Sequence, residues 1–176
     1  FLGVWLLFGF AAHLLGWTRG PGSDGRLVSA TLVMVPQLLW FIGIYLGIAA
    51  FAPAAYRWHQ RWGLRALLVL VALAALVDVV RFGLGVGIVG NLNFLLVWLA
   101  LHQCGFAWRD GSLTTPVAVG LLGVGAVGLV LAVTRGPYPV SMVGLPADEV
   151  SNMAPPTAAL LAQGLALIGI AALLRG

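Results

Sequence analysis

The chain has 176 residues, of which 61% are hydrophobic and only 8% are charged. Soluble domains carry about 25% charged residues, so this composition excludes a soluble globular protein and predicts an integral membrane protein with the lipid bilayer as its partner. The net charge of +4 comes from nine arginines, no lysine and five acids. The basic balance reflects a few loop arginines and not a nucleic-acid-binding face, which excludes nucleic acid as a partner.

Charge-free apolar runs predict about six membrane-spanning helices, because a bilayer core needs about 20 apolar residues per helix. They are expected at 1–17, from 27 to about 56, at 64–82, from 90 to about 108, at 114–134 and at 155–174. Pro155 and Pro156 suit the first turn of the sixth helix. The expected fold is therefore all-α, a polytopic transmembrane helix bundle, with residues 1–176 as a single transmembrane domain. Since the sequence starts at Phe1 with membrane-like residues, we expect it to be part of a longer membrane protein.

The arginines of the short loops predict the orientation of the bundle. The loop between the second and third spans contains three arginines and no acid, namely Arg57, Arg61 and Arg65. The loop between the fifth and sixth spans balances Arg135 with Asp148 and Glu149. Because cytoplasmic loops carry an excess of arginine and lysine, the first of these loops is expected in the cytoplasm. Alternation of the spans then places both ends of the chain and the Arg109-Asp110 turn in the cytoplasm as well.

The arginine-rich loop "YRWHQRWGLR" allows two interpretations. Its three arginines, interleaved with Trp58, His59 and Trp62, suit the phosphates of a nucleotide-like carrier, which would make Arg57, Arg61 and Arg65 cofactor-binding residues. Attraction to anionic lipid headgroups explains the same residues equally well.

Polar residues gather where the third predicted span ends and the fourth begins. In "VDVVRFG", Asp78 and Arg81 are three residues apart, on one face of a helix, where they can form an ion pair at the membrane boundary. Asn91 and Asn93 follow closely and add two amide groups. These four residues form either an interfacial ion pair with neighbours or a polar pocket that binds a hydroxyl-bearing substrate.

The stretch "FLLVWLALHQCGFAWRDG" ends the fourth span with His102, Gln103 and the lone Cys104. An imidazole can accept and return a proton near neutral pH, so His102 is the candidate catalytic residue and Gln103 a candidate substrate-binding residue. The alternative is a histidine that only bonds a neighbouring helix. Cys104 is expected to pack as a small apolar residue.

Several stretches, taken together, resemble actinobacterial membrane acyltransferases of the acyltransferase-3 family. They are "LLWFIGIYL", "VDVVRFG", "FLLVWLALHQCGFAWRDG", "GPYPVSMVG" and "VSNMAPPT", and the resemblance covers roughly residues 36 to 174. It implies a bacterial cytoplasmic membrane protein with about ten spans and both ends cytoplasmic, of which this chain would supply the last six. It also implies O-acylation of extracytoplasmic sugars or small molecules, with acyl-CoA as the donor.

One departure from the family concerns its catalytic histidine, which lies in the first span, eleven residues after a basic residue. His13 does not match, because Leu2 occupies the position eleven before it. The family's catalytic role is therefore not carried over to any residue of this chain. The resemblance implies that this chain works together with the preceding N-terminal spans of a longer parent protein, and that those spans supply the histidine.

The predicted function is therefore a membrane O-acyltransferase that moves an acyl group, not an amino-acyl group, from acyl-CoA to a hydroxyl. Acyl-CoA is expected as a substrate, without a tightly bound cofactor or a metal site. One alternative is a transporter or flippase, which would bury charges at mid-membrane and break its helices there. Another is a noncatalytic membrane assembly subunit, with the glycine-rich stretch "GLLGVGAVG" as its interface.

Overall fold

The computed structural model describes residues 7, 10–11, 13–15, 40–143 and 150–175. The chain divides into two compact units, Phe1–Gly47 and Ile48–Gly176. Helix α3 (Trp40–Trp62) crosses the boundary between them. Most of the first predicted span and the first part of the second lie outside the described residues. Everything that follows concerns the second unit.

The second unit contains four helical segments that are long and apolar enough to cross a membrane: Leu64–Gly83, Gly87–Arg109, Thr115–Arg135 and Ala158–Arg175. They coincide with the third to sixth predicted spans, so the described residues contain four of the expected six or so. No strand occurs in the described part of the chain, whose elements are all helical, and the all-α prediction is confirmed. Each helix satisfies its own backbone hydrogen bonds, which apolar surroundings require.

The first two of these segments are composite. Helix α4 (Leu64–Asp78) continues directly into a π-helical turn, η1 (Val79–Gly83). A 3-10 turn, η2 (Gly87–Leu92), leads into α5 (Asn93–Arg109). The irregular turns therefore lie together at one end of α4 and α5, where the sequence predicted a turn and a polar cluster.

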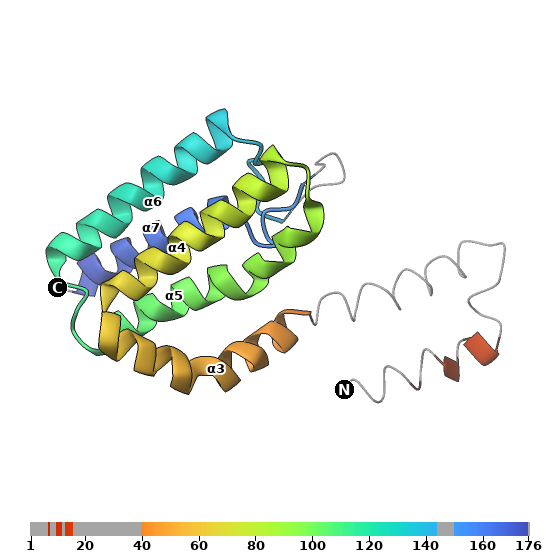
Figure 1. Cartoon of the computed structure of the whole chain (residues 1–176), viewed down its shortest axis with the longest axis horizontal. Helices are drawn as coiled ribbons and strands as arrows, with labels where there is room; N and C mark the ends of the chain where they lie inside the picture. The colour runs from red at the N-terminus through yellow and green to blue at the C-terminus, as the bar shows by residue number, and fades with distance from the viewer. Residues whose placement is uncertain (1–6, 8–9, 12, 16–39, 144–149, 176) are drawn as a thin grey trace. The chain divides into compact units, whose positions relative to one another are not determined.

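Helices α6 (Thr115–Arg135) and α7 (Ala158–Arg175) complete the bundle. They pack most extensively against each other, α4 packs against α5, and α7 also contacts α4 and α5 (Figure 1). The α6–α7 contact depends on small residues: a side chain at Gly169 would place its Cβ 2.6 Å from the backbone nitrogen of Leu122. Only glycine permits this approach of two backbones.

The centre of the bundle is apolar. Its buried core comes from α4, α5 and α7 and consists of Leu67, Leu70, Ala74, Val97, Ala100, Cys104, Leu161 and Leu165. Cys104 is a free, buried thiol in this core, which confirms its prediction as a packing residue. Polar side chains that are buried in the second unit lie toward the ends of the helices.

Two local predictions need correction. The arginine-rich stretch predicted as a loop is mostly helical, because α3 continues past Pro53 to Trp62 and α4 starts at Leu64. The chain reverses at Gly63, whose φ of 53° glycine adopts without a steric penalty. Pro155 and Pro156 precede α7 instead of forming its first turn.

Candidate functional site

Two polar clusters lie at opposite ends of α4. We call the residues Tyr56, His59, Gln103 and Asp110 the His59 cluster; it lies where α3 meets α5 and the α5–α6 turn. We call Asp78, Asn93, Tyr138 and the backbone N–H of Ala158 the Asp78 cluster. Since an α-helix rises 1.5 Å per residue, the length of α4 separates the two clusters by about 20 Å.

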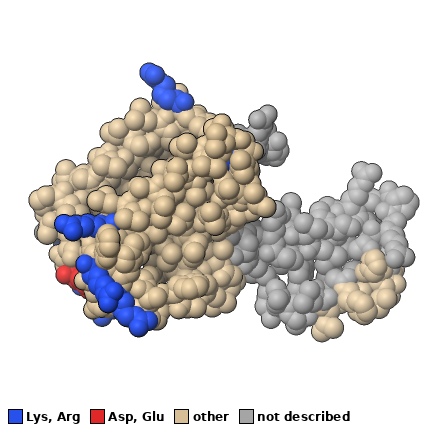
Figure 2. Space-filling view, in the orientation of Figure 1, with Lys and Arg blue, Asp and Glu red and all other residues tan. Residues whose placement is uncertain are grey.

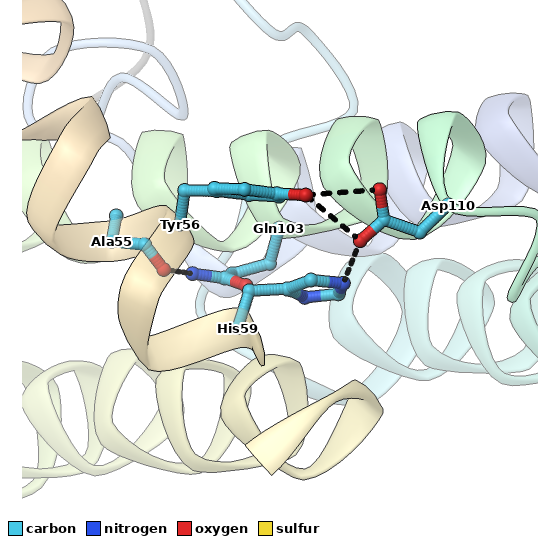
Figure 3. A network of polar contacts seen from close by, with 5 residues as sticks. All are labelled: Ala55, Tyr56, His59, Gln103 and Asp110. Atoms are coloured by element: carbon cyan, nitrogen blue, oxygen red, sulfur yellow. Dashed lines mark hydrogen bonds and ion pairs between the residues drawn. The ribbon is translucent and has the colours of Figure 1, made fainter. Parts of the chain in front are cut away.

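The imidazole of His59 is the centre of the first cluster. His59 is only 4% exposed. Its Nδ1 lies 3.0 Å from Oε1 of Gln103, and its Nε2 lies 3.6 Å from Oδ2 of Asp110. Figure 3 shows the ring between these two side chains, one from α5 and the other from the turn that follows it. Both ring nitrogens therefore face an oxygen.

The amide of Gln103 determines which ring nitrogen carries a proton. Its Nε2 donates to the backbone oxygen of Ala55 at 3.2 Å, so its oxygen faces His59. An amide oxygen can only accept, so Nδ1 of His59 is the donor in this contact. Nε2 is left with a lone pair or with a second proton directed at Asp110. His59 is thus an oriented acid–base group.

Asp110 connects this buried imidazole with solvent. Its carboxylate accepts a hydrogen bond from the Tyr56 hydroxyl, whose oxygen lies 3.3 Å from Oδ1 and 3.5 Å from Oδ2. The side chain of Asp110 is 30% exposed, whereas that of His59 is 4% exposed. The Tyr56 ring stacks on His59 with a 6.3 Å centroid separation, and Phe106 packs against both rings. Nε2 of His59 therefore faces a partly exposed carboxylate, and the rings of Tyr56 and Phe106 lie beside the imidazole.

Arginines surround this end of the bundle. The exposed ones on α3, α4, α5 and α7 are Arg57, Arg61, Arg65, Arg109 and Arg175. Arg109 lies over the Tyr56 ring at 5.0 Å, and Arg175 lies over the Trp108 ring at 5.2 Å. Figure 2 shows several basic side chains near one end of the described bundle, a further basic side chain apart from them, and a broad uncharged surface between. The three arginines predicted to bind a carrier are thus at the same end as His59.

His102 does not belong to the His59 cluster. It is half-buried, and its ring meets the edge of Phe106 at a centroid distance of 5.4 Å. The structure gives it no hydrogen-bond partner among the described residues. Its catalytic role stays a prediction, as does the predicted contact of Gln103 with a substrate. In this structure both the oxygen and the nitrogen of the Gln103 side-chain amide bind groups of the protein.

The carboxylate of Asp78 is the centre of the second cluster. Asp78 is 2% exposed and accepts three hydrogen bonds. They come from Nδ2 of Asn93 at 2.9 Å, the hydroxyl of Tyr138 at 2.9 Å and the backbone N–H of Ala158 at 2.6 Å. Ala158 is the first residue of α7, where unpaired N–H groups and the helix dipole favour a negative charge. Asp78 therefore ties α4 to α5, to the α6–α7 loop and to α7.

The predicted ion pair between Asp78 and Arg81 is not formed in the described residues. The Arg81 guanidinium lies over the Phe82 ring at 4.7 Å, and its Nη1 is buried without an acceptor. The prediction assumed α-helical geometry, but the π turn η1 starts directly after Asp78 and changes the angle between positions three apart. Asn91 also differs from Asn93: it is exposed on η2, whereas Asn93 is fully buried.

The α6–α7 loop is held by its own polar contacts. Nδ2 of Asn152 donates to the backbone oxygens of Pro139 at 2.8 Å and Ser141 at 3.0 Å, and Thr157 donates to Oδ1 of Asn152 at 2.8 Å. These contacts keep Tyr138 next to Asp78. Sequence reasoning did not select Tyr138, Asn152 or Thr157. The sequence could have indicated them in one way only. In a strongly apolar chain, polar residues that become buried need hydrogen-bond partners, so these residues were candidates for a polar cluster.

No protein-family model matches the chain, and no curated protein or solved structure matches it. Among the described residues, no group of three or more His, Cys, Asp or Glu side chains could hold a metal ion. The candidate site therefore depends on its geometry alone.

Proposed function

We propose that this chain is part of a bacterial membrane O-acyltransferase that transfers an acyl group from acyl-CoA to a hydroxyl of an extracytoplasmic sugar or small molecule. The observation that carries the proposal is the orientation of His59, whose Nδ1 faces Gln103 and whose Nε2 faces Asp110 at the arginine-rich end of the bundle. The resemblance of the sequence to acyltransferase-3 proteins supports the same activity.

The chemistry of the reaction requires a proton carrier. An oxygen–acyl bond forms at the acceptor hydroxyl, the carbon–sulfur bond of the thioester breaks, and a proton passes from the hydroxyl to the sulfur of CoA. A buried imidazole with a fixed tautomer suits this transfer. His59 has this arrangement, whereas His102 has only an aromatic neighbour. His59 is therefore the better placed of these two histidines, and it would act together with the histidine that the resemblance places in the preceding spans.

The exposed arginines suit the donor. CoA carries phosphate groups, and Arg57 and Arg61 lie on the last turns of α3, the helix that carries His59. Arginine binds phosphate through charge-assisted, often paired hydrogen bonds. Because acyl-CoA is a cytoplasmic metabolite, we place the arginine-rich end in the cytoplasm, in agreement with the arginine bias of the loops.

A transporter is the less favoured alternative, because its substrate site would lie near mid-membrane. In the described residues the buried polar clusters lie toward the helix ends, and the centre of the bundle is apolar. No observation on the described helices favours an assembly subunit over an enzyme.

Two variants test the proton carrier in membranes that contain the chain together with its parent spans. We expect His59→Ala to lower transfer of radiolabelled acetyl groups from acetyl-CoA by at least about 100-fold, because a positioned proton-transfer group contributes about that much or more. His102→Ala is the matched control, expected to retain most of the activity. Normal turnover of His59→Ala, or a larger loss for His102→Ala, contradicts the assignment.

Donor binding is tested separately. Replacing Arg57, Arg61 and Arg65 together by Gln is expected to weaken acetyl-CoA binding at least about 10-fold, since each charged hydrogen bond is worth about 1.5–3 kcal/mol. Arg135→Gln at the opposite end of α6 is the control. Equal affinities in all variants would reduce the arginines to lipid-facing residues.

A further inference from the structure

Two buried polar atoms, one in the Asp78 cluster and one on the neighbouring Arg81, have no hydrogen-bond partner in the described chain. They are Oδ1 of Asn93, which is an acceptor, and Nη1 of Arg81, which is a donor. More than nine-tenths of buried polar groups in proteins have a partner, so these two vacant atoms require an explanation. Neither is needed for the reaction proposed at His59.

Asp78 is not the vacant group. Its carboxylate already accepts hydrogen bonds from Asn93, Tyr138 and Ala158. These bonds join α4 to α5, to the α6–α7 loop and to α7. Asp78 is therefore a structural residue that positions its neighbours.

Asn93 presents its oxygen for a definite reason. The residue is fully buried, and its Nδ2 donates to the backbone oxygen of Ala74 at 3.3 Å and to Oδ1 of Asp78 at 2.9 Å. A flipped amide would place its oxygen against these two oxygens. The orientation is therefore fixed by repulsion as well as attraction, and Oδ1 is directed away from both acceptors without a donor of its own.

The Arg81 side chain packs directly against Gly90, near the Asp78 cluster, because glycine has no side chain there. A Cβ at Gly90 would come within 2.8 Å of Cδ of Arg81, so the arginine stem crosses the surface of η2 where only glycine leaves room. The Phe82 ring, over which the guanidinium lies, also meets the edge of the Tyr138 ring at a centroid distance of 5.4 Å. It does not form an ion pair with Asp78 in the described residues, and its Nη1 stays vacant.

We infer that Arg81 and Asn93 form a binding site for a hydroxyl group of a neutral ligand, such as a sugar or another polyol. A polyol can satisfy both atoms, because a hydroxyl can accept from Nη1 of Arg81 and can also donate to Oδ1 of Asn93. An anion finds no donor on Asn93 and is repelled by the neighbouring Asp78, whereas a cation is repelled by Arg81. Both atoms are buried in this structure. The ligand therefore enters when the Arg81 side chain moves off Gly90. The inference concerns binding alone and does not depend on acyl transfer.

The test uses the full chain in lipid nanodiscs, because alkyl glycoside detergents would themselves supply sugar hydroxyls. The probes are methyl glucoside, which is neutral, and methyl glucuronide, which has the same ring with a carboxylate. Binding is measured by saturation-transfer nuclear magnetic resonance on the probe and by the Nε–H signal of Arg81. No acyl-CoA is present, so failure here is distinct from failure of the proposed function.

We expect saturable binding of methyl glucoside, weaker binding of methyl glucuronide, and a shift of the Arg81 signal. Arg81→Met removes the donor, leaves the three bonds of Asp78 intact, and is expected to weaken binding at least about 10-fold. Arg135→Met, on the exposed end of α6, is the control that keeps wild-type affinity.

Three results would overturn the inference. Absence of methyl glucoside binding would mean that the two atoms bind only water. Equal affinity in Arg81→Met and the wild type would separate Arg81 from the ligand. Stronger binding of methyl glucuronide would identify an anion site in place of a hydroxyl site.

Discussion

The two ends of the bundle each contain a carboxylate, but the two carboxylates have different surroundings. Asp78 is almost fully buried and accepts three hydrogen bonds between 2.6 Å and 2.9 Å. Asp110 lies on a turn, its side chain is 30% exposed, and its contacts with Tyr56 and His59 are 3.3–3.6 Å long. The short, enclosed contacts of Asp78 suit a fixed architecture. The longer contacts of Asp110, open to solvent, suit a group that exchanges protons.

The largest expected effect is the loss of Asp78. Asp78→Ala leaves the donors of Asn93, Tyr138 and Ala158 without their acceptor in a buried region, so we expect the free energy of unfolding to fall by at least about 3 kcal/mol. Asp110→Ala is the control, with an expected loss below about 1 kcal/mol because its contacts are partly exposed. Unfolding in a denaturing detergent, followed by circular dichroism, measures both. Equal losses would remove the distinction between the two carboxylates.

A smaller effect is expected for Tyr138, which donates to Asp78 from outside the membrane-spanning helices. Tyr138→Phe removes one hydrogen bond to a carboxylate, worth about 1.5–3 kcal/mol. Tyr56→Phe, whose hydroxyl contacts Asp110 at 3.3 Å and 3.5 Å, is the matched control and should lose less. The reverse order of losses would contradict the structural role of the Asp78 cluster.

The same tyrosine predicts a dependence of stability on pH. Burial, together with the charge of Asp78 and the hydrogen bond to it, raises the pKa of Tyr138 above its usual value. The folded state therefore holds this proton more tightly than the unfolded state. The resulting stability is fully present below about pH 10, the usual tyrosine pKa, and is lost as the pH rises further. In Tyr138→Phe this part of the alkaline decline should disappear; an unchanged decline would assign it to other groups.

Apolar patterning was sufficient to predict the third to sixth spans where four helices are long and apolar enough to cross a membrane, because a bilayer core requires about 20 apolar residues per helix. The packing role of Cys104 followed from the same composition. The π turn after Asp78 could not be predicted in this way, since Val79–Gly83 has the same apolar character as an α-helical continuation. That turn is the reason why Asp78 and Arg81, although three residues apart, are not an ion pair.

The site was only partly predictable because its contacts join residues far apart in the sequence. Asn93 was selected from its position near Asp78, and the two do share a hydrogen bond. His59 was noted only as part of an arginine-rich stretch, because its partners Gln103 and Asp110 are 44 and 51 positions away. His102 had the more suggestive neighbours in sequence. A helix places adjacent residues on different faces, so Gln103 reaches the cluster and His102 does not.

The smallest expected effect concerns the tautomer of His59, which sharpens the contrast between the two ends without changing the fold. Gln103→Leu removes the oxygen that faces Nδ1, and the proton is then expected to move to Nε2, where Asp110 can accept it. The loss in unfolding free energy should be about 1–2 kcal/mol, because the contact with His59 and the hydrogen bond to the Ala55 oxygen are both removed. Nitrogen chemical shifts of the labelled imidazole distinguish the two tautomers directly. Gln163→Leu on α7 is the control with an unchanged His59 spectrum. A proton already on Nε2 alone in the wild type would show that Gln103 does not orient the ring, and His59 would lose the feature that distinguishes it from His102.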